Sequence, residues 1–519
     1  MFERNMPPFR TGNSHLNLEQ YRQKVRGCWM GKNIGGTFGA PYEGNPNMND
    51  AKFYTNIVPG SPAPNDDLDI QLVWLLAAAE NGLENLTPLK MGEYWFSHVT
   101  GPWNEYGVCR ANISRGFMPP LSGSCNNETW FRSNGAWIRS EIWACLCPGA
   151  PDEAIKYAYM DACCDHYDDG IYAELFTAAL ESAAFVCNDL RELIRIAFSK
   201  IPAKSRVRRS VELAMKLYDS KISLQEAREE IVRDSADLGM FQAPANIAFV
   251  VLGLLYGEGD FEKSLQYAVN CGDDTDCTGA TVGAIFGIMN GFDAIPEKWR
   301  EPIGDGIVTV CINTIGALLP LPRTTEELTR QVVNLAVDTA KNNPLRFLQL
   351  TDEPTELAQE YHLDDSTEAE NIWNYSPYKL QFPVAWGNIY VDYSGGPVVS
   401  AGCSKKIILT VDHTRFIQDT IEFQWHLPEG CRMEPGNRQK ILSKRCNTSG
   451  CCVNIIFDST DFEMIYIPVD IYLGNRTYPC TIQVPFQGAG TVDFQNWTYR
   501  NAEWQEKGSR LCRLYCEER

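Results

Sequence analysis

The sequence lacks long apolar runs, an apolar leader and an excess of basic charge. No run reaches the roughly 18 apolar residues that a membrane helix needs, so we predict no membrane span. The first residues, MFERNMPPFRTGNSHLNLEQ, lack the apolar core of a secretion signal, which favours a cytoplasmic location. Lys and Arg number 46 against 66 Asp and Glu, giving a net charge of -20. This balance argues against nucleic-acid binding, which needs basic groups to neutralise phosphates.

Cysteines are present, but they lack the spacing of a disulfide framework or of a structural zinc site. The chain has 19 of them, an odd and scattered set. Three close pairs occur, namely Cys145 with Cys147, Cys163 with Cys164, and Cys451 with Cys452. None is followed by the second pair that a structural zinc site requires. We interpret most cysteines as small buried side chains in a reducing compartment.

The pattern of apolar residues changes near residue 350. A chain of 519 residues is too long for one ordinary core, so we expect more than one domain. Residues 1–350 show helical periodicity, as in IYAELFTAALESAAFV, and predict an all-α domain. Residues 377–519 alternate in short runs such as KKIILTVDH, which is typical of a β-sandwich. The acidic stretch 351–376 is predicted to be a linker or a surface crossing.

Two predicted helices begin with three carboxylates each. The stretches are PAPNDDLDIQLVWL at 62–75, with Asp66, Asp67 and Asp69, and GDDTDCTGATVGAIFG at 272–287, with Asp273, Asp274 and Asp276. One Asp can cap a helix and contribute about 1 kcal/mol, but three cannot all be caps. Burying an unpaired carboxylate costs several kcal/mol, and a hard divalent cation would remove that cost. The alternative is two solvated helix starts that are capped independently.

A third stretch, GCWMGKNIGGTFGAPYEG at 27–44, combines an amphipathic start with many glycines. Gly31, Gly35 and Gly39 recur every four residues, and this spacing lets another backbone approach closely. Glu43 follows Pro41 in a predicted turn. The alternative interpretation is tight helix packing followed by an ordinary surface turn.

Together, the three stretches resemble the ADP-ribosylglycohydrolase family through most of residues 20–345. The resemblance implies a compact all-α domain around a pair of divalent metals, usually Mg²⁺, with Mn²⁺ or Ca²⁺ as other hard ions that suit these ligands. The implied metal ligands are Asn65, Asp66, Asp67, Asp274, Asp276 and Cys277. Glu43 matches the family's acidic residue near the scissile bond, which makes it the general acid–base candidate. Asp67 is the second catalytic candidate.

Two implied ligands depart from the family pattern. Asn65 and Cys277 stand where the family has ligand threonines. An amide oxygen can still bind a hard ion, but the soft sulfur of Cys277 suits Mg²⁺ poorly. One metal is therefore expected to be weakened, lost or replaced by another metal. Asp69, one turn into its helix, is an alternative ligand.

The resemblance also implies a substrate pocket in the middle of the chain. The segment Gly135-Ala136-Trp137-Ile138-Arg139 resembles a family G-A-x-x-R helix, and His166 falls where the family often has a His. We expect Gly135, Arg139 and His166 to contact substrate. The alternatives are an ion pair of Arg139 with a carboxylate such as Glu141, and a structural His166.

The implied function is metal-dependent hydrolysis of a ribosyl or furanosyl glycosidic bond, with an ADP-ribosyl compound as substrate. Two alternatives stay open: a hydrolase of the same fold that acts on another carbohydrate or nucleoside glycoside, and an inactive binding or structural relative. The expected partner is a small glycoside or an ADP-ribosylated substrate, with no nucleic acid or membrane. Aromatic residues of the predicted β-sandwich could stack on sugars, although such residues are more often core.

Overall fold

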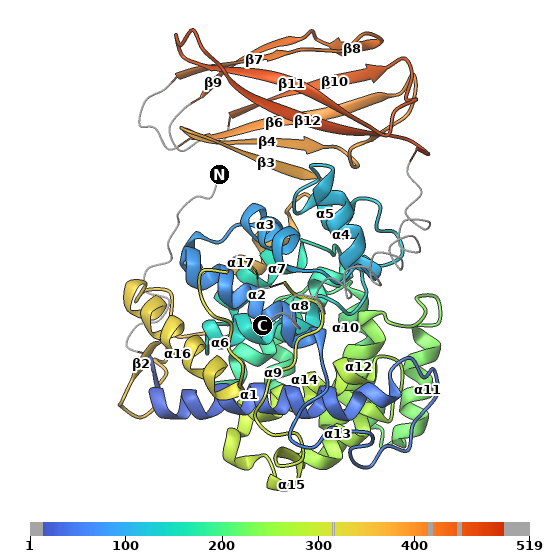
Figure 1. The fold of residues 1–519 in the computed structure, drawn as a ribbon, viewed down its shortest axis with the longest axis vertical. Coiled ribbons are helices and arrows are strands. Elements are labelled where there is room, and N and C mark those ends of the chain that lie inside the picture. The colour runs from blue at the N-terminus through green and yellow to red at the C-terminus, as the bar shows by residue number, and fades with distance from the viewer. Residues whose placement is uncertain (1–13, 314, 316, 414–418, 444–448, 492–519) are drawn as a thin grey trace, which may run out of the picture.

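The computed structural model describes residues 14–313, 315, 317–413, 419–443 and 449–491. It divides into a helical region and a strand-rich region that lies against one end of it (Figure 1). This confirms the predicted order of an all-α part followed by a β part. Among the described residues, no helix combines the length and apolarity needed to cross a membrane. Every described cysteine is a free thiol.

Sixteen α-helices and four short 3₁₀ helices build the helical region within the described residues. The α-helices are α1 (Leu18–Gly39), α2 (Asp66–Asn81), α3 (Pro88–His98), α4 (Asn104–Ser114), α5 (Leu121–Ser124), α6 (Glu141–Leu146), α7 (Pro151–Ala162), α8 (Asp169–Ala184), α9 (Leu190–Phe198), α10 (Arg206–Asp219), α11 (Leu224–Asp234), α12 (Ala243–Gly257), α13 (Phe261–Val269), α14 (Thr275–Asn290), α15 (Glu297–Arg300) and α16 (Thr325–Asn342). The 3₁₀ helices are η1 (Ala40–Tyr42), η2 (Leu83–Asn85), η3 (Trp137–Arg139) and η4 (Phe292–Ala294).

Helices α1 and α14 run antiparallel in backbone contact, because glycines line both facing surfaces. A Cβ on Gly31 would lie 2.0 Å from the carbonyl oxygen of Gly283, and a Cβ on Gly283 would lie 2.1 Å from that of Gly31. Gly35 and Gly279 meet in the same way. The prediction that the glycine spacing admits another backbone is confirmed. The contact fixes the end of α1 beside the start of α14.

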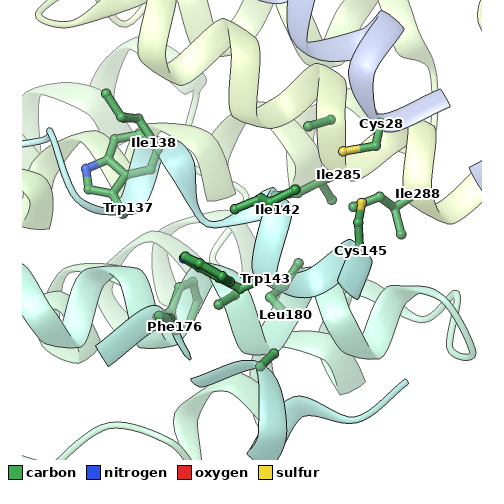
Figure 2. Close-up of a cluster of buried hydrophobic side chains, with 14 of the residues drawn as sticks. Cys28, Trp137, Ile138, Ile142, Trp143, Cys145, Phe176, Leu180, Ile285 and Ile288 are labelled. Carbon is green, nitrogen blue, oxygen red and sulfur yellow. The ribbon is translucent and has the colours of Figure 1, made fainter. Parts of the chain in front are cut away.

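Apolar side chains from distant parts of the helical region meet in one large core. Figure 2 shows Cys28 of α1 near Ile285 of α14, with Trp143 of α6 packed above Phe176 of α8. All four side chains are buried. Every residue of α14 from Thr275 to Ile288 is buried, so the helix lies inside this core rather than on its surface.

The strand-rich region consists of two five-stranded sheets that share one apolar core (Figure 1). One sheet has the order β3-β4-β6-β10-β8 and the other the order β5-β12-β11-β7-β9. Neighbouring strands are antiparallel, except for the parallel pair β5 and β12. The strands are β3 (Lys379–Val384), β4 (Gly387–Tyr393), β5 (Val398–Val399), β6 (Ser404–His413), β7 (Asp419–Trp425), β8 (Cys431–Glu434), β9 (Arg438–Ser443), β10 (Ser449–Phe457), β11 (Met464–Leu473) and β12 (Cys480–Gly488).

Short helices of the helical region join the two parts. Phe117, Leu121 and Cys125, around α5, belong to the buried apolar cluster of the strand-rich region. At the edge of this contact Arg115 forms an ion pair with Glu463 at 2.7 Å. The strand-rich region is therefore packed on the helical one through both apolar and charged contacts.

The segment 351–376, predicted as a linker or surface crossing, packs on the helical region. It contains α17 (Thr367–Trp373), which lies against α7. The hydroxyl of Tyr361 donates to the carbonyl of Gly149 at 2.7 Å. Just before it, β2 (Gln349–Thr351) pairs in parallel with β1 (His15–Asn17), so the two ends of the helical region meet.

Candidate metal centre

The two acidic helix starts meet at the end of α1. The α1–α14 contact brings the turn after η1, which carries Glu43, next to the first turn of α14. Backbone hydrogen bonds fasten this turn: the N–H of Gly44 donates to the carbonyl of Asp273, and the N–H of Asp273 donates to that of Asn45, at 2.8 and 2.7 Å. The start of α2 completes the site from the other side.

Two groups of potential metal ligands result, and they share one carboxylate. Glu43, Asp274 and Asp276 form one group, while Asp67, Asp276 and Cys277 form the other. In each group one ligand atom per residue lies within 4.8 Å of the others. Asp67, Asp276 and Cys277 are buried, whereas Glu43 is exposed and so opens the cluster to solvent. The structure thus brings together acidic residues that are more than 200 positions apart in the chain.

Several carboxylate oxygens in the cluster are held by neutral donors. The amide of Asn134 donates to Asp274 Oδ2 at 2.7 Å, and the hydroxyl of Tyr106 donates to Asp66 Oδ2 at 3.1 Å. The thiol of Cys277 donates to Asp67 Oδ1 at 3.4 Å. These contacts orient the acidic side chains without neutralising them.

Other oxygens are buried with no hydrogen-bond partner among the described residues. They are Asp67 Oδ2, Asp274 Oδ1 and Asp276 Oδ1, together with Oδ1 of the neighbouring Asp69. Leaving a buried carboxylate oxygen unpaired is costly, and either protonation or a bound cation relieves that cost. Oxygen-rich acidic sites suit hard divalent cations. The residues present therefore fit a metal ion, as the sequence predicted.

Crowding of these carboxyl groups raises their pKa values. Repulsion from Asp276, followed by burial, raises the pKa of Glu43 to about 7. Burial first, and then Asp276, raises the pKa of Asp66 to about 6. The same two causes raise the pKa of Asp274. A bound cation would favour the ionised form of these groups and so lower their pKa values.

One basic side chain, that of Lys32, lies beside the cluster, and the sequence analysis did not identify it. Lys32 of α1 is fully buried, with its Nζ 3.6 Å from Asp67 Oδ2 and 2.8 Å from Glu141 Oε1. The amide of Gln71 bridges the same two acids, because it donates to Glu141 Oε2 and to the backbone carbonyl of Asp67, both at 2.8 Å. The available signal was a lysine that is the one charged residue of the glycine-rich stretch 27–39.

Asn65 and Asp69, the flanking members of the first run, are engaged by backbone groups. Asn65 Oδ1 accepts from the N–H of Asp67 at 2.7 Å and so caps α2. Asp69 Oδ2 accepts from the N–H groups of Val310 and Cys311 at 2.6 and 2.7 Å. A metal contact by Asn65 stays a prediction, as does one by Asp69.

The three predicted substrate residues lie in a buried network. Arg139 pairs with Asp161 at 2.7 Å and with Asp165 at 2.6 Å, and it is fully buried. His166 is also fully buried, between Asp165 and the hydroxyl of Ser133. Arg139 thus forms the ion pair given above as its alternative role, but with Asp161 and Asp165 instead of Glu141. The contacts of His166 correspond to its alternative, structural role. Contact with a substrate stays a prediction for both residues.

Gly135 has a packing role in the structure. A Cβ at this position would lie 2.2 Å from the carboxylate of Glu105 and 2.7 Å from the ring of Tyr106. Tyr106 in turn donates to Asp66. Gly135 thus admits a residue that orients the cluster, whereas direct substrate contact by Gly135 stays a prediction. Asn134, one residue earlier, had not been identified, although it donates to Asp274.

Comparison with known proteins agrees with this geometry. A family model described as ADP-ribosylglycohydrolase matches residues 17–338, which include Glu43 and both acidic runs. The chain belongs to the ADP-ribosylglycohydrolase family. It is also 27% identical over 302 residues to an uncharacterized protein of Archaeoglobus fulgidus, covering 54% of this chain and 92% of that protein. Membership supports a hydrolase acting on glycosyl bonds.

Proposed function

We propose that this protein is a metal-dependent hydrolase that cleaves a ribosyl or furanosyl bond, with an ADP-ribosyl compound as substrate. One observation carries the proposal: an exposed carboxyl group, Glu43, adjoins buried carboxylates whose free oxygens lack partners. Family membership supports the reaction class. We propose two divalent cations as the cofactor, with Mg²⁺ in the all-oxygen group of Glu43, Asp274 and Asp276 and the second ion in the group of Asp67, Asp276 and Cys277.

A divalent cation in the cluster would supply positive charge that binds ring hydroxyls and acidifies a water molecule. The protein's own groups would perform the proton transfers. Glu43 stands at the solvent edge, where it can give a proton to the leaving group or take one from the attacking water. Asp67, whose Oδ2 lies 3.6 Å from Lys32 Nζ and accepts no hydrogen bond from the described residues, would orient that water. The negative cluster would favour the positive charge that develops on the ring.

Hydrolysis assays test this function. The substrates are ADP-ribosylated peptides, small ADP-ribosyl compounds, nucleosides and simple furanosides, each assayed with Mg²⁺, with Mn²⁺ and with chelator. We expect release of ADP-ribose that stops when metal is removed. Release of another sugar would redirect the proposal to a different glycoside, and no hydrolysis of any substrate by metal-loaded protein would contradict it.

Glu43→Gln separates chemistry from binding. Loss of a general acid–base lowers turnover by about 10²–10⁴-fold. Since the second ligand group lacks Glu43, this variant should still gain thermal stability with metal. Glu93→Gln, at an exposed position on α3, is the matched control and should keep full activity. Wild-type turnover in Glu43→Gln would remove Glu43 from the reaction.

A further inference from the structure

The two ligand groups differ in donor chemistry, although they share Asp276. Glu43, Asp274 and Asp276 offer only oxygen, whereas the second group adds the sulfur of Cys277. Carboxylate oxygen suits Mg²⁺, Ca²⁺ and Mn²⁺, while a thiolate favours softer ions such as Zn²⁺. The same kind of ion is therefore not expected to suit both groups equally.

We propose that Asp67, Asp276 and Cys277 form a thiolate site for a Zn²⁺-like divalent transition metal, beside an all-oxygen site for a hard ion. The proposal deepens the function proposed above, because it assigns different metals to the two parts of that centre. It depends on metal binding at the cluster but not on the identity of the substrate.

The position of Cys277 supports a role as a metal ligand rather than as a side chain that only packs in the core. The residue is 5% exposed, and although it belongs to the buried apolar cluster, its sulfur lies within hydrogen-bond distance of the Asp67 carboxylate. Two ligands of one tetrahedral zinc ion, at about 2.3 Å for sulfur and about 2.1 Å for oxygen, lie about 3.6 Å apart. The sulfur of Cys277 and Asp67 Oδ1 are 3.4 Å apart. The hydrogen-bonded pair thus already has a separation that suits a shared ion.

The buried oxygens around this sulfur provide independent support. Asp67 is 0% exposed and Asp276 is 9% exposed, and Asp276 Oδ1 has no hydrogen-bond partner among the described residues. Asp67 Oδ2 also accepts no hydrogen bond there, and Lys32 Nζ lies 3.6 Å from it. Three protein ligands with a fourth position left for water or substrate are the usual arrangement of a catalytic zinc site. On metal binding, the thiol proton that now lies between Cys277 and Asp67 leaves to solvent, and both atoms become free to bind.

Cobalt binding tests the proposal without reference to activity. Co²⁺ bound to a thiolate shows a strong charge-transfer absorption in the near ultraviolet, which a purely oxygen-ligated ion lacks. Full-length protein, stripped with chelator and checked for its circular dichroism, is titrated with Co²⁺. We expect the band in the wild-type protein and its loss in Cys277→Thr and Cys277→Ser. Cys271→Ser, which removes a buried thiol outside both groups, should keep the band.

Competition between ions gives a second readout. With chelator-buffered Zn²⁺, Cys277→Thr should lower Zn²⁺ affinity by at least about tenfold while Mg²⁺ affinity holds or rises. A wild-type Co²⁺ spectrum without the band, or a band unchanged in both Cys277 variants, overturns the proposal. Hydrolysis with Mg²⁺ and no band would refute the thiolate site alone. A Cys277-dependent band without hydrolysis would refute the proposed function and leave the metal site standing.

Discussion

The two acidic helix starts look alike in the sequence but differ in how far the protein satisfies them. At the start of α2, Asn65 caps the helix, Asp69 binds two backbone N–H groups and Asp67 lies beside the ammonium of Lys32. At the start of α14, Asp274 has one oxygen bonded to Asn134, while Asp276 Oδ1 has no partner among the described residues. Each run keeps two buried oxygens without a hydrogen-bond partner among the described residues, on Asp67 and Asp69 in the first and on Asp274 and Asp276 in the second. Among these residues only the first run has a basic side chain within ion-pair distance, Lys32, so the second depends more on a bound cation.

The largest effect is expected at the shared carboxylate. Asp276→Asn removes a ligand from both groups, so we expect turnover to fall by at least about 10³-fold, within the range of losses at such groups. The rise in melting temperature on adding Mg²⁺ should disappear at the same time. Because one source of repulsion is gone, the chelated variant should melt higher than the chelated wild-type protein. Activity assays and melting curves, with and without metal, measure both effects.

Asp293→Asn is the matched control for this prediction. Asp293 lies in η4, at the far end of the helix that carries Asp276, and outside both ligand groups. The Asp293→Asn variant should keep wild-type activity and the same metal-dependent rise in melting temperature. If Asp276→Asn kept the Mg²⁺-dependent gain, the difference drawn between the two helix starts would fail, because the second run would not need the cation.

Lys32→Met is expected to have the next largest effect, and it acts on the first run. The change leaves Glu141 buried without its 2.8 Å partner and removes the cation nearest Asp67. Breaking a buried ion pair from one side costs about 3–5 kcal/mol of the free energy of unfolding. Urea denaturation of the chelated protein measures this loss.

An exposed pair provides the control. Lys52, 76% exposed and 3.2 Å from Asp50, should change stability by less than about 1 kcal/mol when replaced by Met. In Lys32→Met, added metal should restore part of the lost stability, since a divalent ion can take over neutralisation of Asp67. A Lys32→Met protein as stable as the wild type would show that the first run does not rely on its internal cation.

The sequence predicted the parts of the site that depend on local pattern. Carboxylates in the first turn of two apolar helices, and glycines every four residues in a third, identified the three stretches that meet in the structure. The role expected for Glu43 came from the resemblance to the family. The choice among partners could not be predicted, because it depends on contacts across the fold. Lys32 reaches Glu141 over 109 positions, and Asp69 reaches Cys311 over 242.

The same limit explains the placement of Arg139. The neighbouring acid in the sequence, Glu141, was the suggested partner, but Lys32 and Gln71 hold its carboxylate. Arg139 therefore pairs with Asp161, in the last turn of α7, and with Asp165, just after that helix. Closeness in sequence cannot predict these pairings, because Glu141 and the aspartates that pair with Arg139 are all buried and each must be neutralised.

The smallest effect is expected for Asp69→Asn, which tests whether this carboxylate of the first run is structural or a metal ligand. Asp69→Asn keeps an oxygen for the backbone N–H groups of Val310 and Cys311 but makes both hydrogen bonds neutral, so we expect a loss of about 1 kcal/mol in the free energy of unfolding. The metal-dependent thermal gain should equal that of the wild-type protein. Asp67→Asn, two residues earlier, should lose most of that gain. If both variants lost the metal-dependent rise in melting temperature equally, Asp69 would be a metal ligand. The first run would then depend on metal as much as the second, because the backbone contacts of Asp69 would not account for its presence.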